Sequence, residues 1–384
     1  MKVGFLIESL AVSAGGPAQA AAIVSRGLAE RGVEVVIGTL PRHEKRVTID
    51  PRVRVVHVAG SVYNPLNWLR AVRGIRKLAS NVDVLFVSGI WGPVDGLAMR
   101  LAGDLGVPVH TRICGMLEDY ILARNPARKW LGRLCYTDHN LRNSTSLIVN
   151  TRIEGDHVRA LGFPTPIDVI PNGVVPPSRD ALPTRNEAVR MLGLRVHEQD
   201  KVMLYLSRIH PKKGLHKLLG GIKDVFAKNP QWQLVVAGDF YQGEGYEDAV
   251  RSLVRESGIS DRIQFLGEVA AEKKAAAFSL ADLFVLPSES EGFSNAILEA
   301  MSYGVPVLIT PGCNFPEVEQ QGAGWIVRPD EAALRDQLKA ILPNAGELSA
   351  RGGAARKLIE DRYLESHVVD AYFELASKAA KKSR

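Results

Sequence analysis

The sequence predicts an α/β protein of two domains, each built on a mostly parallel, doubly wound sheet. The chain has 384 residues, more than a single hydrophobic core usually supports. Short apolar runs typical of buried strands alternate with longer helix-like stretches, the pattern of βαβ units. A Pro-rich segment at residues 171–184 interrupts this alternation, which then restarts. We therefore expect two similar domains joined by a linker.

The first half, residues 1–175, forms the predicted N-terminal domain. Its expected strands cover residues 3–8, 33–39, 52–58, 82–87, 107–111, 146–150 and 167–170. Helices are expected at 16–31 and 65–79 and between the later strands. Two segments fit this pattern poorly: residues 39–52 are polar and irregular, and residues 125–145 are helix-like without clean periodicity.

The second half, residues 176–362, forms the predicted C-terminal domain. Its expected strands cover residues 201–207, 233–237, 263–265, 282–286, 305–309 and 325–327. Its expected helices cover residues 215–228, 246–257, 271–280, 295–302, 331–342 and 348–361. A last helix, at about 363–380, is expected to cross back onto the N-terminal domain.

The composition is that of an ordinary globular protein, with 46% apolar and 23% charged residues. No apolar run approaches the roughly 18 residues that span a bilayer, and the apolar run within residues 1–8 is too short for a secretory signal. Cys114, Cys135 and Cys313 show no metal-binding spacing. We expect structural thiols, no metal site and a reduced, cytoplasmic setting.

The positive charge is concentrated in the first half. Residues 1–175 carry 21 Lys and Arg against 14 Asp and Glu, whereas the remainder carries 27 against 28. This asymmetry suggests an anionic partner for the N-terminal domain, such as lipid head groups, a diphosphate-linked acceptor or nucleic acid. The basic amphipathic stretches 66–77 and 123–133 suit peripheral contact with an anionic membrane, and equally suit core helices with a solvated face. The sequence shows no basic sheet motif interleaved with aromatic residues, so we expect no nucleic-acid partner.

The most informative motif is Glu291 and Glu299, which flank a Gly-bearing turn between an expected strand and helix. Loops of this kind bind ligands in open α/β sheets. The helix N-terminus offers N–H groups to an anion, and the carboxylates can accept hydrogen bonds from hydroxyls. A ligand that has both an anionic group and several hydroxyls would fit such a site, and a sugar nucleotide is a ligand of this kind. The plainer interpretation is a capped, solvent-facing helix start.

A basic loop follows the first strand of the second domain. Arg208 and Lys213 in this loop could hold the two phosphates of a nucleoside diphosphate, since Arg supplies a fork and Lys a point charge. Taken alone, these two residues would be interpreted as part of a solvated basic loop. Because Glu291 and Glu299 lie in the same half of the chain, we favour a phosphate site.

Small residues follow other strands. Gly15 and Gly16 permit close backbone approach after the first strand, without the GxGxxG spacing of dinucleotide-binding oxidoreductases. The turns that contain Gly238 and Leu266 can wrap a nucleobase through backbone contacts, and are also ordinary strand exits.

These motifs together resemble the retaining glycosyltransferases of family 4. The match covers nearly the whole chain and is strongest in Ser207-Arg208, Lys213-Gly214, Ala237-Gly238, the Glu291/Glu299 pair and residues 300–306. Residues 171–174 and Gly15-Gly16 are further hallmarks. Pro311-Gly312 and Gly324-Trp325 are similar to the branch that builds bacterial exopolysaccharide and O-antigen. The resemblance implies the GT-B fold: two Rossmann-like, doubly wound parallel-sheet domains facing across a cleft.

The resemblance also implies a role for each matching residue. Arg208 and Lys213 would neutralise the departing diphosphate, Glu291 would contact sugar hydroxyls, and Glu299 would bind the ribose. The remaining donor contacts would come from Gly15, Gly16, Gly238, Leu266, Gly292, Phe293, Ser294 and Asn295.

The acceptor side departs from the family pattern. Many members carry a His or Arg where this chain has Cys114. Arg112 or His110 could substitute, so Arg112 and Cys114 are the acceptor-side candidates.

The expected activity is transfer of a hexosyl group, with retention, from a nucleoside diphosphate sugar to a hydroxyl of a lipid-linked or growing saccharide. Synthesis of surface polysaccharide, including lipopolysaccharide, is the expected setting. No cofactor and no metal are expected. Alternatives are a phosphorylase or hydrolase of the same architecture, or an inert scaffold subunit that binds sugar nucleotides. A nucleic-acid-binding protein is a further alternative.

Overall fold

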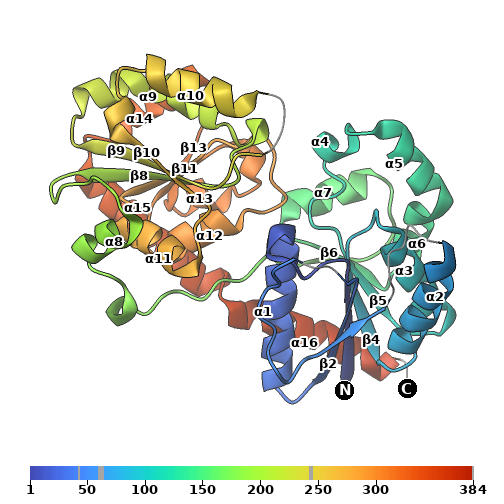
Figure 1. The fold of residues 1–384 in the computed structure, drawn as a ribbon. Coiled ribbons are helices and arrows are strands. Elements are labelled where there is room, and N and C mark those ends of the chain that lie inside the picture. The colour runs from blue at the N-terminus through green and yellow to red at the C-terminus, as the bar shows by residue number, and fades with distance from the viewer. Residues whose placement is uncertain (42–43, 59–64, 242–244, 383–384) are drawn as a thin grey trace. The chain divides into compact units, whose positions relative to one another are not determined.

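The structure, a computed structural model, describes all residues except 42–43, 59–64, 242–244 and 383–384 (Figure 1). The chain divides into two compact units: residues 1–173 with 365–384, and residues 174–364. The sequence analysis expected residues 1–175 with about 363–380 in one domain and 176–362 in the other. Each unit contains a parallel sheet covered by helices, which confirms the doubly wound α/β prediction.

The sheet of the first unit has the strand order β3-β2-β1-β4-β5-β6-β7. Its strands are Lys2–Ile7 (β1), Glu34–Thr39 (β2), Arg54–His57 (β3), Val84–Ser88 (β4), Val109–Arg112 (β5), Ser146–Val149 (β6) and Ile167–Val169 (β7). Its helices are Gly16–Glu30 (α1), Pro65–Ala79 (α2), Pro93–Asp104 (α3), Asp119–Leu122 (α4), Pro126–Gly132 (α5), Asp138–Asn143 (α6), Arg152–Ala160 (α7) and Glu365–Lys382 (α16).

Both faces of this sheet are buried, which explains why β1 is a continuous apolar run rather than an alternating one. Val3, Phe5 and Ile7 point to one side and pack with α1 and α16. Leu6 points to the other side and packs with α2 and α3. Figure 1 shows α1 and α16 together beside this sheet.

The last helix, α16, is anchored to α1 and to β5 within the first unit. Arg26 donates two hydrogen bonds of 2.6 Å to the Glu365 carboxylate, and Arg112 donates one of 2.7 Å to the Tyr372 hydroxyl. The helix that ends the chain is therefore part of the first unit, as expected from the sequence.

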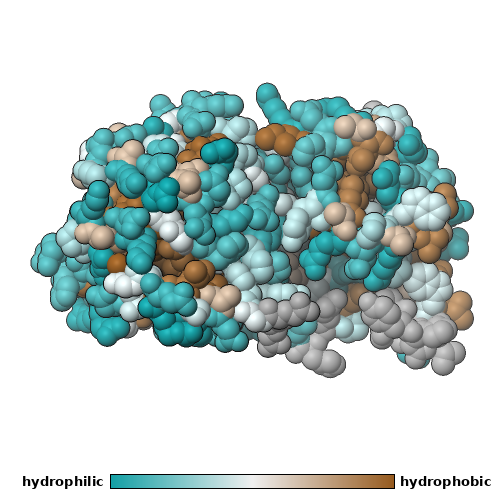
Figure 2. All heavy atoms as spheres, turned by 90° about the horizontal axis from the view of Figure 1, so that it is seen from above, coloured by the Kyte–Doolittle hydropathy of each residue, from teal (hydrophilic) through white to brown (hydrophobic). Residues whose placement is uncertain are grey.

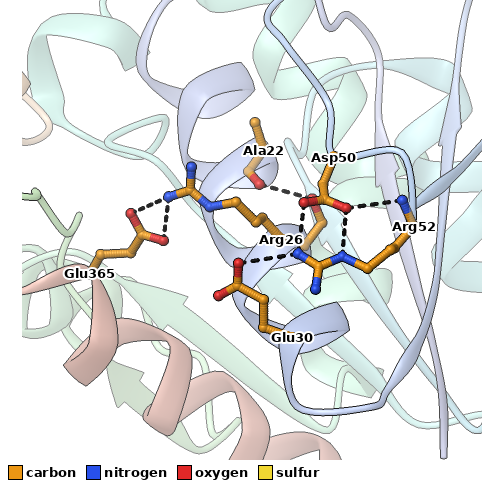
Figure 3. A network of polar contacts seen from close by, with 7 residues as sticks. Ala22, Arg26, Glu30, Asp50, Arg52 and Glu365 are labelled. Atoms are coloured by element: carbon orange, nitrogen blue, oxygen red, sulfur yellow. Dashed lines mark hydrogen bonds and ion pairs between the residues drawn. The ribbon is translucent and has the colours of Figure 1, made fainter.

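A second arginine, Arg52, connects the loop before β3 to helix α1 (Figure 3). Arg52 donates hydrogen bonds of 2.8 Å to both oxygens of Asp50, and one of 3.1 Å to Glu30 on α1. The Arg52 side chain is 53% exposed, so solvent screens these pairs, and each contributes little stability and mainly fixes the loop's position.

The sheet of the second unit has the strand order β10-β9-β8-β11-β12-β13. Its strands are Lys201–Leu206 (β8), Trp232–Ala237 (β9), Ile263–Gly267 (β10), Leu283–Leu286 (β11), Val307–Ile309 (β12) and Gly324–Ile326 (β13). Its helices are Arg185–Leu192 (α8), Leu215–Lys228 (α9), Tyr246–Glu256 (α10), Ala271–Leu280 (α11), Asn295–Ser302 (α12), Glu317–Gln320 (α13), Glu331–Ile341 (α14) and Ala345–Arg362 (α15).

The segment 125–145, which lacked clean periodicity, contains a π-helix. Arg133–Thr137 adopts this wider helix between α5 and α6. A π-helical turn closes on the fifth residue rather than the fourth, so the apolar positions lose their regular spacing. In the described ranges no helix is long and apolar enough to cross a bilayer.

We predict that His110 makes stability depend on pH. The ring is 3% exposed, stacks on Phe86 and pairs with Ser146 at 2.7 Å. Burial lowers the pKa of His110 from 6.5 to about 4. Below pH 6.5 the imidazole is protonated in the unfolded chain but stays neutral in the folded chain. Up to about 3 kcal/mol of stability is therefore lost as the pH falls to about 4.

Thermal unfolding measured from about pH 7 to about pH 5 checks this expectation. The double variant His110→Phe/Ser146→Ala removes the titrating ring together with its partner and should lose less stability across this range. An identical pH dependence in wild type and variant would show that the imidazole is not responsible.

Candidate functional site

The strand order of the second unit reverses between β8 and β11. From β8 the chain proceeds to β9 and β10 on one side, then returns to place β11 on the other. Loops at such a reversal diverge and leave a crevice outside the carboxyl ends of the strands, where ligands bind. The two loops concerned, residues 207–214 and 287–294, are those that carry Arg208, Lys213 and Glu291.

Backbone contacts hold these two loops together. The Glu289 N–H and the Ser288 hydroxyl both donate to the Lys212 carbonyl, at 2.9 and 3.2 Å. Gly214 has φ +72°, and a Cβ there would overlap the carbonyl oxygen of Pro287. Glycine is therefore required at 214 both for its conformation and for the close approach of the loops.

A third loop, after β12, fixes the backbone at Glu291. The Glu291 N–H donates to the Gly312 carbonyl at 2.7 Å, and the Asn314 side chain donates to the Glu291 carbonyl at 2.8 Å. With its N–H and its carbonyl both engaged, the Glu291 backbone is held in one position.

An ion pair crosses the reversal point. The Lys213 ammonium pairs with the Glu291 carboxylate, and the two side chains are only 16% and 9% exposed. Burying charges is costly even when they are paired, so such a pair is weak support for a purely stabilising role. Arg208 is exposed and makes no hydrogen bond or ion pair within the described part of the chain. Of the two cations expected to hold the diphosphate, Lys213 is thus paired and Arg208 is not.

Helix α12 begins beside this pair. Ser294 is its N-cap residue in extended conformation, and its side chain makes no capping hydrogen bond. The first turn, together with Gly292 and Phe293 before it, can therefore direct backbone N–H groups at an anion. Asn295 is the first residue of the helix, and Glu299 lies one turn further on.

Glu299 is paired with a lysine that the sequence analysis missed. Lys274 on α11 donates a 2.6 Å hydrogen bond to the Glu299 carboxylate, and both side chains are partly exposed. This pair orients the carboxylate that was expected to bind ribose.

Gly238 and Leu266 lie at the same edge of the sheet. Gly238 follows β9 with φ +130°, and its N–H donates to the Gly267 carbonyl at 2.8 Å. A Cβ at 238 would overlap the carbonyl oxygen of Ser207, so the backbones after β8 and β9 meet here. Leu266 is a partly buried residue of β10.

The remaining expected donor contacts belong to the first unit. Gly15 has φ +69° and precedes α1, while Gly16 is its first residue. Their expected approach to the donor phosphates stays a prediction.

The expected acceptor-side residue Arg112 and its proposed substitute His110 are both buried. Arg112 is 5% exposed, and its guanidinium donates to Tyr372, Asn150 and Asn172. It joins β5 to neighbouring segments, and its place on the acceptor side stays a prediction. His110 is buried in the sheet.

Cys114 is half-buried in a left-handed conformation, φ +55°. Burial raises the pKa of its thiol to about 11, so it remains a neutral thiol at physiological pH. Its place on the acceptor side stays a prediction.

The first unit has a strand reversal of its own, between β1 and β4. Glu8 and Asp95 both lie against Gly92 there, since a Cβ at 92 would contact both carboxyl groups. Burial raises the pKa of Asp95, and the neighbouring Glu8 raises it further. The sequence analysis did not single out this pair because the two residues are 87 positions apart.

Comparison with known proteins identifies the family. The model of the Glycosyl transferase 4-like domain matches residues 15–173, and that of Glycosyl transferases group 1 matches residues 193–358. A D-inositol 3-phosphate glycosyltransferase of Frankia alni is 30% identical over 311 residues, which cover 74% of this chain and 75% of the relative. The chain belongs to the family 4 glycosyltransferases.

Two further likenesses bear on this glycosyltransferase. A GDP-mannose:cellobiosyl-diphosphopolyprenol alpha-mannosyltransferase of Xanthomonas oryzae pv. oryzae is 29% identical over 233 residues, 59% of this chain but only 57% of the relative. The structure of Anabaena Alr3699/HepE in complex with UDP and glucose superimposes with a TM-score of 0.77, at 19% identity, over 98% of this chain and 100% of that one. This likeness confirms the GT-B fold.

We predict that the close contact of Gly214 with Pro287 contributes more to the cost of substituting Gly214 than its left-handed conformation does. Gly193, which ends α8, has a similar conformation, φ +65°, and a Cβ there would meet no atom within 4 Å. Gly193→Ala should lower the free energy of unfolding by about 1 kcal/mol. Gly214→Ala adds the overlap with Pro287 and should cost about 2–4 kcal/mol.

Urea unfolding of the two variants, followed by tryptophan fluorescence, measures this difference. Equal losses would mean that the two loops can separate freely, and the close approach would then be unimportant to the site.

Proposed function

We propose that this glycosyltransferase moves a hexosyl group, with retention, from a nucleoside diphosphate sugar to an acceptor hydroxyl. The observation that carries the proposal is the clustering of Arg208, the Lys213–Glu291 pair and the start of α12 at the strand reversal of the second unit. Cations and a helix N-terminus suit a diphosphate, and adjacent carboxylates suit the hydroxyls of a sugar and a ribose.

The donor contacts follow from the charges. Arg208 is exposed and can take a phosphate as a bidentate fork. Lys213 can turn one of its donors to the second phosphate while it remains near Glu291. Glu291 accepts hydrogen bonds from the transferred sugar, assisted by N–H groups of residues 292–295, and Glu299 accepts from the ribose. The turns at Gly238 and Leu266 border the base.

Catalysis in this proposal rests on stabilising the leaving group. The bond between the anomeric carbon and the diphosphate oxygen breaks, and a bond to the acceptor oxygen forms on the same face of the sugar. The acceptor proton passes to the departing diphosphate. Arg208, Lys213 and the α12 N-terminus stabilise the negative charge as it develops on the diphosphate.

A double displacement is not proposed, because Glu291 is paired with a lysine and held by backbone contacts rather than placed to attack. Arg208 and Lys213 supply the positive charge that a metal ion supplies in other transferases. We therefore propose a reaction without cofactor or metal.

One relative supports a saccharide acceptor on a lipid. The Xanthomonas relative is named for GDP-mannose and a diphosphopolyprenol-linked cellobiosyl acceptor, and HepE is described with UDP and glucose. We propose a lipid-linked or growing saccharide as acceptor, in the synthesis of exopolysaccharide or lipopolysaccharide. We also propose that the enzyme works at the cytoplasmic face of an anionic membrane, which its first unit contacts.

We predict that one nucleoside diphosphate among UDP, GDP and ADP raises the thermal unfolding midpoint of the wild type. At about 100 times its dissociation constant a ligand stabilises the protein by about 2.7 kcal/mol. Glu299→Ala and Arg208→Ala should reduce the shift, because they remove the ribose and phosphate partners. Glu247→Ala removes a carboxylate from the exposed surface of α10 in the same unit and should leave the shift unchanged.

No shift with any of the three nucleotides would overturn the donor site. A shift that is equal in the Glu299→Ala and Glu247→Ala variants would place the nucleotide elsewhere.

We predict that the product keeps the anomeric configuration of the donor and that activity survives chelation. Proton NMR of the first turnovers gives the configuration, and an assay with EDTA tests for a metal. An inverted product would exclude same-face displacement, and release of free sugar without acceptor would favour a hydrolase.

A further inference from the structure

Helix α5 of the first unit presents large apolar side chains to solvent. Its residues, Pro126–Gly132, include none that is buried. Trp130 is 66% exposed, Leu131 is 53% exposed, and Leu134 in the following π-helix is 70% exposed. Figure 2 looks onto the face that carries α4 and α5 and shows brown, hydrophobic residues there among teal, hydrophilic ones. Three such side chains within five residues form a patch that folding leaves uncovered.

The charged side chains on this patch are mostly positive, and the acidic Asp138 beside them is paired with Arg133. Residues 123–137 contain Arg124, Arg128, Lys129 and Arg133 and no acidic residue. Arg124 and Arg128 are exposed, and their guanidinium groups make no hydrogen bond or ion pair within the described residues. Arg133 is paired with Asp138 at 2.9 Å, and Lys129 donates to the Ile121 carbonyl. The unpaired cations thus lie at the start of the helix, beside the apolar side chains.

A groove of about 420 Å³ runs along the same helix. Trp130 and Leu134, one helical turn apart, contribute apolar walls. Lys129 and Arg133 contribute positive charge, and Asp138, the partner of Arg133, is the acidic residue of the lining. Apolar walls with cations beside them fit a molecule that has both an apolar chain and an anionic head.

The other basic amphipathic stretch is different. Helix α2 also exposes Trp68 and Leu69, by 36% and 63%. Its opposite face packs Ala71, Ile75 and Leu78 into the core of the first unit. It is a core helix with a solvated basic face, the plainer of the two interpretations open from the sequence.

We propose that the α5 surface, made of Arg124, Arg128, Trp130, Leu131 and Leu134, docks on an anionic phospholipid bilayer. The inference deepens the membrane contact proposed above and rests on that proposal. Trp and Leu enter the boundary between head groups and acyl chains, while the arginines pair with lipid phosphates. We propose an anionic rather than a neutral bilayer, because each basic residue near a negatively charged surface is attracted to it.

Sedimentation with vesicles tests this assignment, using the full chain. Wild type should bind vesicles of phosphatidylcholine mixed with phosphatidylglycerol and not vesicles of phosphatidylcholine alone. Raising the salt from about 0.1 M to about 1 M shortens the Debye length from about 10 to about 3 Å and should weaken binding. Arg124→Ser/Arg128→Ser should lower the partition coefficient by about tenfold or more, and Trp130→Ser/Leu131→Ser/Leu134→Ser should abolish binding.

Trp68→Ser/Leu69→Ser is the matched control, because it removes exposed apolar side chains from the basic face of α2, and it should bind as wild type does. Each variant should keep the wild-type unfolding midpoint and the nucleotide-induced shift, which separates loss of docking from misfolding and from failure of the donor site. Unchanged vesicle binding in the α5 variants, loss of binding in the α2 variant, or no binding by wild type would overturn the proposal. So would a wild-type dimer that the triple α5 variant dissociates, since a second copy would then cover this surface.

Discussion

The ion pair between Lys213 and Glu291 is the interaction on which the candidate site depends. It joins the loops after β8 and β11 at the point where the strand order of the second unit reverses. Two largely buried charges are held there at an energetic cost, and the surrounding backbone is organised to hold them. Glycine at 214 lets the two loops touch, and Asn314 fixes the carboxylate's backbone from the third loop. A site fixed from three directions loses little entropy when a ligand binds.

The same construction principle applies to the first unit. Its sheet reverses between β1 and β4, and the carboxyl groups of Glu8 and Asp95 meet at that reversal. The two reversal points differ in charge: a cation balances the carboxylate in the second unit, whereas two carboxyl groups face each other in the first. Parallel sheets thus bring reactive side chains together at the carboxyl ends of their strands. The residues in the loops there determine which ligand can bind.

The sequence was sufficient for the elements whose signals are local. Helices at 65–79, 215–228, 271–280 and 295–302 have the predicted limits, because proline, glycine and apolar spacing act within a few residues. The sequence could also place Arg208, Lys213 and Glu291 at one edge of a sheet. It could not supply Lys274 or Asn314, whose partners are remote in the chain. It could not show that Arg112 is buried, because the contacts of this arginine with Tyr372, Asn150 and Asn172 depend on tertiary packing.

The most direct test of the account is hydrogen exchange with and without a nucleoside diphosphate, read by mass spectrometry. Amide exchange reports where a ligand stabilises the backbone. The account predicts slower exchange in residues 208–214 and 288–299 with one of UDP, GDP or ADP, and no change in the exposed helix α10. Protection confined to other segments, or no protection with any of the three nucleotides, would contradict the assignment of the site.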